Sequence, residues 1–364
     1  MGEIARFVIE RVEILRPDGT LAGPLPAFAE DPDELVKLYR AMVLTRTYDT
    51  KAVALQRTGR LGTVASSLGQ EAVAVGTAAA MRPEDVLLPS FREQGAMLWR
   101  GVRIEELLTF WGGDERGSDF AGPREDFPVC IPVGTHAPHA AGVATAFKLR
   151  REPRVAVCVL GDGATSKGEV YEALNLAGVW RLPMVTVVNN NRWAISVPVE
   201  AQTAAATLAQ KAIAAGIPGI QVDGNDVIAV RAVVARAIER ARAGEGPTLV
   251  EATTYRLSDH TTADDARRYR DDAEVSTRWK EEPIGRLRAF LLARGLWDKA
   301  REEALLADCA RAVDEAVAVY LARPPAPATD MIDSVFARLP APLARQRAEI
   351  ERRARARAAE AAGR

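Results

Sequence analysis

The middle of the chain alternates short apolar runs with longer segments of helical periodicity. Five runs have the length and composition of buried strands: residues 86–88, 155–160, 184–188, 219–222 and 248–252. The helical segments among them lie near Glu105, Ala140, Val170 and Val227. This alternation predicts an α/β fold with a doubly wound, mostly parallel sheet.

The two ends of the chain differ from this central pattern. The first 30 residues alternate only loosely between apolar and polar positions, around the turn signal Pro17-Asp18-Gly19. Asp31 or Asp33 can then cap the first long helix. A proline-rich stretch begins at Pro324 and precedes a segment of arginine, alanine and glutamate. We therefore expect an arm at 1–30, the α/β domain at 31–323, and a linker with a helical tail at 324–364.

Charge and composition exclude several classes of partner. The 364 residues include 48 basic and 49 acidic side chains, and this balance argues against bulk attraction to nucleic acid or to an anionic membrane. The arginines of residues 345–357 are interleaved with alanine and glutamate, which is typical of a solvated helix face. No apolar run reaches the roughly 20 residues of a membrane span. Three scattered cysteines predict no disulfide framework, so we expect a cytoplasmic protein.

Polar residues follow two consecutive strands of the predicted sheet. Gly161-Asp162-Gly163 ends one strand, and Asn189-Asn190-Asn191 ends the next after a single helical crossover. Such a crossover makes the strands parallel, so both groups fall at the same edge, where open α/β sheets bind ligands. Asp162, the Asn191 amide and the Trp193 backbone carbonyl offer oxygen atoms that suit Mg²⁺. The pattern predicts a magnesium–diphosphate site.

Other phosphate motifs fit this stretch less well. Residues 163–168 lack the Gly-Lys-Ser/Thr ending of a P-loop, and the third glycine comes too late for a dinucleotide fingerprint. Asp162 would repel a bare pyrophosphate, an objection that a bridging metal removes. Taken alone, the Gly-Asp-Gly turn is equally well explained as a capped strand-to-helix turn, and only the matched asparagines favour the metal site.

Five segments in order carry a resemblance to a known family. Residues 161–175 (GDGATSKGEVYEALN) and 191 resemble the thiamine diphosphate motif. Together with the segments LGQE, LPSFRE, NRWAIS and YRLSDHTTADD, they are similar to the α subunit of the decarboxylating component of 2-oxo acid dehydrogenase complexes; the segments are residues 68–71, 88–93, 191–196 and 255–265. The resemblance covers about residue 30 to about residue 345.

The resemblance implies the cofactors and their ligands. Thiamine diphosphate would bind with Mg²⁺ held by Asp162, Asn191 and the Trp193 carbonyl, where members often have tyrosine in place of tryptophan. Arg92 would contact the diphosphate, whereas Phe91 lacks the hydroxyl of the usual tyrosine and would only pack there. The other implied contacts are backbone ones, from Ile131 and Val133 to the aminopyrimidine ring and from Gly163 and Ala164 to the diphosphate.

Histidines are scarce in this chain, and His260 is the strongest catalytic candidate. An isolated loop histidine is usually solvated, but the resemblance places His260 over the mouth of the site, where it would contact the diphosphate and take part in proton transfer. Residues 258–270 are polar, and we expect this loop to lack apolar anchors and to become ordered over bound cofactor. Thr261 replaces the serine that kinases modify in regulated relatives. His136 is a further candidate near the site, and His139 a weaker one.

The resemblance also implies an incomplete site. The cofactor's aminopyrimidine needs a glutamate, which in this branch of the family comes from a β subunit of an α2β2 heterotetramer. A lipoyl-bearing acyltransferase would be the next partner, and a 2-oxo acid the substrate. We expect pyruvate as the substrate, with branched-chain 2-oxo acids as the alternative. A non-catalytic Mg²⁺–phosphate-binding scaffold subunit is the alternative of another class.

Overall fold

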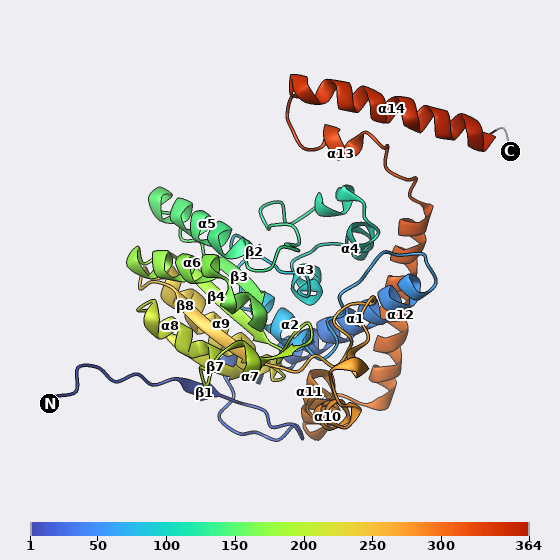
Figure 1. Ribbon diagram of the computed structural model, residues 1–364. Helices are drawn as coiled ribbons and strands as arrows, with labels where there is room; N and C mark the ends of the chain where they lie inside the picture. Colours follow the sequence, from blue (N-terminus) through green and yellow to red (C-terminus); the bar gives the residue numbers. More distant parts are fainter. Residues whose placement is uncertain (1, 363–364) are drawn as a thin grey trace. The chain divides into compact units, whose positions relative to one another are not determined.

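The computed structural model describes residues 2–362 and divides into two compact units, Met1–Ala318 and Val319–Arg364. The first unit is built on a six-stranded sheet of order β1-β7-β8-β4-β3-β2, in which every pair of neighbours is parallel (Figure 1). Its strands are β1 Glu10–Val12, β2 Val86–Leu88, β3 Ala156–Gly161, β4 Met184–Asn190, β7 Gly219–Asp223 and β8 Thr248–Thr253. The predicted α/β class is confirmed.

Register brings the two polar groups together at the carboxyl edge of the sheet. Gly161 of β3 is the partner of Asn189 of β4, and Asn190 is the partner of Thr253 of β8. The chain turns into a 3-10 helix, Asp162–Ser166, directly after β3. Asp162 and Asn191 therefore leave neighbouring strands at the same edge, as the crossover argument predicted.

Two helices cover one face of the sheet and pack on every second residue of β3. Helices α5 (His136–Arg150) and α6 (Gly168–Val179) run together there, and their alanines pack on Leu88, Cys158 and Leu160 in one buried cluster (Figure 1). Small side chains allow this close approach, because an alanine helix can lie nearer a sheet than a leucine helix. Helix α9 (Val227–Arg242) contacts β4, β7 and β8 and packs on α2 (Glu71–Ala79). The sheet edge is thus mounted on a rigid, buried scaffold.

The structure confirms the predicted cap of the first long helix, and it also contains a small hairpin that was not predicted. Asp31 is the cap of α1 (Pro32–Arg57), since its side chain accepts a hydrogen bond from the Asp33 N–H. The arm contributes only the three-residue strand β1, which pairs with β7. The small hairpin of β5 (Trp193–Ala194) and β6 (Val197–Pro198) was not predicted, because two-residue strands have no detectable period. The remaining helices of this unit are α3 Gln94–Trp99, α4 Ile104–Trp111, α7 Val199–Gln202, α8 Lys211–Ala214, α10 Asp272–Arg278, α11 Pro283–Ala293 and most of α12 Lys299–Ala322.

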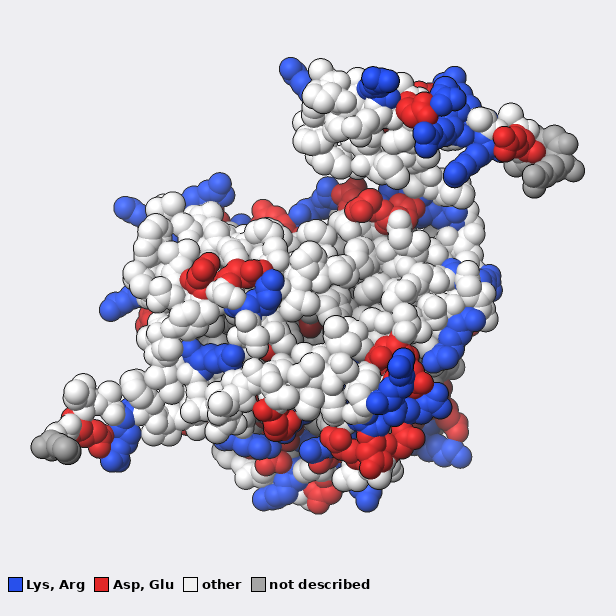
Figure 2. Space-filling model, viewed as in Figure 1, with Lys and Arg blue, Asp and Glu red and all other residues white. Residues whose placement is uncertain are grey.

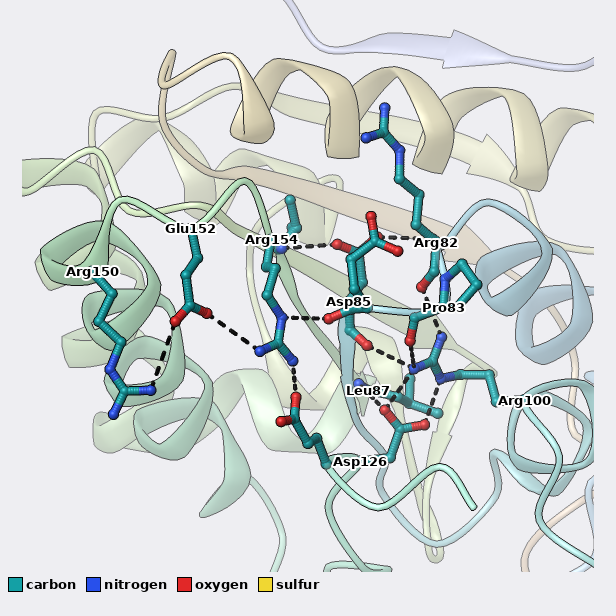
Figure 3. Close-up of polar contacts among 12 residues, drawn as sticks. Arg82, Pro83, Asp85, Leu87, Arg100, Asp126, Arg150, Glu152 and Arg154 are labelled. Atoms are coloured by element: carbon teal, nitrogen blue, oxygen red, sulfur yellow. Dashed lines mark hydrogen bonds and ion pairs between the residues drawn. The ribbon is translucent and has the colours of Figure 1, made fainter.

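A network of ion pairs and hydrogen bonds ties the amino ends of β2 and β3, opposite the polar edge (Figure 3). Arg100 donates to both carboxylate oxygens of Asp126, at 2.5 and 2.9 Å, and also to the carbonyl of Asp85. The Asp85 side chain accepts from the Val155 N–H at 2.9 Å and from Arg242 at 2.8 Å. Each of these buried carboxylates therefore has a cationic partner and a backbone donor.

The second unit contains the short helix α13 (Asp330–Asp333) and the long helix α14 (Ala341–Ala362). The arginines of α14 are largely solvent-exposed and pair with Glu349 and Glu351 along the helix, as a solvated face would. The predicted domain limits at 30 and 323 stay predictions. Across residues 2–362, no helix has both the length and the apolar character that crossing a membrane requires.

Candidate active site

A cavity of about 540 Å³ opens at the carboxyl edge of the sheet. This volume lies within the range of about 300–1,000 Å³ that is typical of cofactor and substrate sites. The cavity is lined by all ten residues to which the family resemblance gave a metal, cofactor or catalytic role: Phe91, Arg92, Ile131, Val133, Asp162, Gly163, Ala164, Asn191, Trp193 and His260. Figure 2 shows that the surface around the central hollow of this face is mostly uncharged.

Asp162 is a buried acidic group of the cavity. It is 2% exposed, and its Oδ2 accepts a hydrogen bond from Gln202 Nε2 at 2.7 Å. Burial raises the pKa of Asp162, although the Gln202 bond and the charges of Arg256 and Arg92 oppose this shift. The next residue, Gly163, has no room for a side chain, because a Cβ there would lie 2.7 Å from the Cβ of Ala194 in the β5–β6 hairpin. The residue type at 163 is thus dictated by close approach.

The three asparagines have separate roles. Asn189 accepts from the Thr254 hydroxyl, and Asn190 donates to the buried carboxylate of Glu251, so both bind the protein itself. Asn189 and Asn191 both line the cavity, and the Oδ1 of Asn191 accepts the Trp193 N–H at 3.2 Å. An amide oxygen with a free lone pair beside a buried carboxylate is a suitable pair of ligands for Mg²⁺.

The Trp193 carbonyl, the third predicted metal ligand, already accepts a hydrogen bond. Arg256 is fully buried, and its Nη1 donates to the Trp193 oxygen at 3.2 Å, while Nη2 donates to the Ile195 carbonyl at 2.7 Å. A carbonyl has a second lone pair, so this contact leaves room for a metal. Among residues 2–362 there is no group of three or more His, Cys, Asp or Glu side chains that could hold a metal ion.

Arg92 and His260 are in direct contact. Arg92 Nη2 donates to the His260 carbonyl at 2.7 Å and lies 2.9 Å from His260 Nδ1. Arginine has no acceptor, so Nδ1 must be the unprotonated nitrogen and the ring hydrogen is on Nε2. Burial, together with the charges of Arg92 and Arg256, lowers the pKa of His260 to about 4. In this state His260 is a neutral group held between two cations.

The remaining predicted contacts form the apolar side of the cavity. Phe91 packs edge-on against the His260 ring, with the ring centroids 6.1 Å apart. Ile131 and Val133 line the cavity, and they remain 51% and 45% exposed to solvent. His136 also lines it: its Nε2 bonds the Val159 carbonyl at 2.7 Å and Nδ1 is buried without a partner among the described residues. His139 is solvent-exposed and does not line the cavity.

One expectation about the loop at 258–270 was wrong. Its residues are polar, yet Ala266 is 2% exposed and the Tyr269 ring lies 5.6 Å from that of Trp193. Arg270 also donates to the backbone carbonyls of Arg256 and Ser258. The loop therefore has apolar anchors that its composition concealed, because a single tyrosine that reaches a distant tryptophan leaves no periodic signal.

Three further residues of the site were missed by sequence reasoning. Arg256 and Gln70 both occur in segments that carried the family resemblance, but neither was given a role. Glu93, beside Arg92, lines the cavity and accepts a hydrogen bond from the Arg92 N–H. Burial raises the pKa of Glu93 to about 7. Position within a motif was the available signal for all three.

Two buried arginines, Arg92 and Arg256, lie near the acidic side chains of Asp162 and Glu93 at the cavity. Arg92 and Arg256 bond to carbonyl oxygens and to His260, and the cavity also holds buried donors without partners. Such a place is suited to a polyanion whose charge a metal shares with Asp162. The residues present therefore fit a metal–diphosphate group.

Comparison with known proteins agrees with this chemistry. Residues 39–328 match the family model of the dehydrogenase E1 component. The chain therefore belongs to the dehydrogenase E1 component family, which confirms its resemblance to the α subunits of that component.

Individual relatives cover most of the chain. It is 44% identical to a Mycobacterium tuberculosis protein named 3-methyl-2-oxobutanoate dehydrogenase subunit alpha, over 96% of this chain and 95% of that protein. It is 43% identical to the pyruvate dehydrogenase E1 component subunit alpha of Acholeplasma laidlawii, over 76% and 81%. It is 41% identical to the pyruvate dehydrogenase E1 component subunit alpha of Bacillus subtilis, over 85% of this chain and 83% of that protein.

Proposed function

We propose that this chain is the α subunit of a thiamine diphosphate-dependent 2-oxo acid dehydrogenase that decarboxylates its substrate and transfers the acyl group to a lipoyl domain. The observation that carries the proposal is the convergence of Asp162, Asn191, Arg92 and His260 on one cavity at the sheet edge. Thiamine diphosphate, when bound, supplies the electron sink for loss of carbon dioxide. A reducing compartment such as the cytoplasm is part of the proposal, since Cys130, Cys158 and Cys309 are free.

The residues of the chain divide the remaining work. Asp162, Asn191 and the Trp193 carbonyl would hold Mg²⁺, and Arg92 would hold the diphosphate with a charge-assisted contact. Gly163 and Ala164 would contact the diphosphate through their backbone, and Phe91, Ile131 and Val133 would border the organic part of the cofactor. His260 would exchange a proton at Nε2, the nitrogen that Arg92 leaves free.

Two substrates are candidates. Pyruvate is the substrate expected from the sequence, and relatives named pyruvate dehydrogenase support it. The mycobacterial relative named 3-methyl-2-oxobutanoate dehydrogenase subunit alpha, which matches almost the whole chain, supports a branched-chain 2-oxo acid. The ratio of kcat/KM for pyruvate and for 3-methyl-2-oxobutanoate, measured on the chain with a co-expressed β subunit, decides between them.

A β-subunit partner is part of the proposal. The half-exposed Ile131 and Val133 border the cavity. Further exposed apolar side chains lie on α5, on α6 and directly after α6: Leu149, Leu176, Val179 and Trp180. Apolar surface of this kind marks a protein interface. Association as an α2β2 heterotetramer would cover it and bring the glutamate that the aminopyrimidine needs.

The isolated chain tests this assignment directly. Without the partner's glutamate it should not turn over either 2-oxo acid with an artificial electron acceptor, whereas the co-expressed assembly should. Steady turnover by the chain alone would contradict the shared site. An assembly that binds Mg²⁺ and thiamine diphosphate but never turns over would instead favour the scaffold alternative.

A further inference from the structure

Gln70, in the segment Leu68 to Glu71, lines the cavity, and no role has been assigned to it so far. Gly69 has φ +86°, and a Cβ there would lie 2.8 Å from the Tyr255 carbonyl oxygen. The buried Glu71 carboxylate accepts the Gly69 N–H at 3.0 Å and pairs with Arg46 at 2.8 Å. The turn that precedes α2 is therefore fixed by its close packing against Tyr255 and by the hydrogen bond from the Gly69 N–H to Glu71, and it places Gln70 at the cavity.

Gln70 bonds the residue proposed to bind the metal. It is 1% exposed, it lines the cavity, and its Oε1 accepts a hydrogen bond from Asn191 Nδ2 at 3.0 Å. The Asn191 amide cannot be reversed, because its Oδ1 accepts the Trp193 N–H and an NH2 group there would face another donor. Gln70 Oε1 must therefore face Asn191, and this contact keeps the Asn191 oxygen, not its nitrogen, available to a cation.

The other end of the Gln70 amide has no partner. Nε2 is buried and makes no hydrogen bond with any residue in the described range 2–362. A buried donor of this kind costs free energy unless an acceptor reaches it. The cavity is where such an acceptor can arrive, and the guanidinium groups of Arg92 and Arg256, which donate to carbonyl oxygens and not to carboxylates, favour an anion with exposed oxygen atoms.

We propose that Gln70 is a positioning residue that fixes the orientation of Asn191 toward the metal and, through Nε2, a hydrogen-bond donor to an oxygen of the bound metal–diphosphate. The inference rests on the proposed function and adds to it a residue outside the predicted set. The two roles belong to opposite ends of one amide, so different substitutions separate them.

Gln70→Met removes both ends of the amide at similar volume. We expect the Mg²⁺ concentration for half-saturation and the Kd for thiamine diphosphate each to rise by about 10–100-fold, the usual cost of losing a group that orients a metal ligand. Gln70→Glu keeps the acceptor for Asn191 but replaces the donor with an oxygen, so the thiamine diphosphate Kd should rise while Mg²⁺ binding without cofactor is retained.

The measurement is isothermal titration calorimetry on the assembly with the β subunit, with Mg²⁺ and thiamine diphosphate varied in turn. Thr77→Val is the matched control. Thr77 lies on α2, the helix that Gln70 precedes, its buried hydroxyl also lacks a partner among the described residues, and it does not line the cavity. This control should bind both ligands as the wild type does, and the melting temperatures of all variants should agree within a few degrees.

A double-mutant cycle tests whether Gln70 acts through Asn191. In the Asn191→Ala background, Gln70→Met should no longer change the Mg²⁺ requirement, because the group that it orients is gone. Equal effects in both backgrounds would overturn the positioning role, and a Gln70→Glu assembly with wild-type cofactor affinity would overturn the donor role. A wild-type assembly that binds no thiamine diphosphate would overturn the proposed function itself, and this inference with it.

Discussion

The two ends of the central sheet use the same residue types to opposite effect. At the amino end, Arg100 pairs with the carboxylate of Asp126 (Figure 3). Arg242 pairs with the buried carboxylate of Asp85, and backbone N–H groups contact both carboxylates. At the carboxyl end, Arg92 and Arg256 face carbonyl oxygens and a neutral histidine. In the first network each arginine has a carboxylate partner. In the second, the guanidinium groups and the buried donors without partners can bind a ligand.

The pKa values of two buried arginines express this difference. Burial by itself would lower the pKa of Arg242, but the hydrogen bond and charge of Asp85 raise it above its usual value. Burial and the neighbouring Arg256 lower the pKa of Arg92 to about 10, because Glu93, Asp49 and Asp162 compensate too little. A buried cation whose pKa is depressed marks a functional site more reliably than one that is fully paired.

Removing the carboxylate of the cavity should have the largest effect. Asp162→Ala takes away the one acidic residue of the proposed ligand set beside a multiply charged anion, so Mg²⁺-dependent binding of thiamine diphosphate should fall below detection. Asn191→Ala should weaken it less, since a neutral ligand is lost. Calorimetry on the α–β assembly measures both, and wild-type affinity in the Asp162 variant would refute the metal site.

The opposite result is expected at the amino end. Asp126→Ala leaves Arg100 buried without a carboxylate, and losing one partner of such a pair costs about 3–5 kcal/mol. Urea unfolding of the assembly should show this loss, while the folded protein should bind thiamine diphosphate with near-normal affinity. If binding failed and stability stayed the same, the division of roles between the two ends would be wrong.

His260 should affect chemistry more than metal binding. His260→Ala leaves Asp162 and Asn191 on the sheet edge, so the Mg²⁺ requirement should change little, but acyl transfer to the lipoyl domain should fall strongly. Quenched time courses of lipoyl acylation measure the rate of acyl transfer, and Mg²⁺ titrations measure the metal requirement separately. Normal overall activity in this variant would remove His260 from the proposed catalytic group.

The smallest effect concerns pH and Glu93. Its pKa is raised by burial from 4.5 to about 7, so between these values the native state binds more protons than the unfolded state and stability falls as pH rises. Glu93→Gln cannot ionise, so its free energy of unfolding relative to the wild type should increase from pH 4.5 to 7, by on the order of 2–3 kcal/mol. A difference that does not vary over this window would contradict a buried, protonated Glu93.

His260 provides an internal check on that measurement. Its pKa is lowered to about 4, so the unfolded state binds more protons between that value and 6.5, and stability is lost as pH falls. The His260→Ala variant should therefore lack a loss of stability at acidic pH, the reverse of the trend for Glu93→Gln. Finding the same sign for both would show that the two groups do not experience the environment described.

The sequence by itself determined the parts of this protein that depend on local periodicity and local order. The apolar runs at 86–88 and 184–188 correspond to β2 and β4, and the crossover rule correctly predicts that Asp162 and Asn191 lie at one edge of the sheet. These inferences succeed because strand period, crossover handedness and motif order are properties of short segments.

Only the tertiary structure decided which distant residues complete the site. The contact of Arg92 with His260 spans 168 positions and that of Gln70 with Asn191 spans 121. Tyr269 anchors its loop through Trp193, and β1 joins the sheet beside β7. Such contacts are set by packing geometry between elements, which leaves no periodic trace along the chain. The same is true of the charge balance that distinguishes the two ends of the sheet.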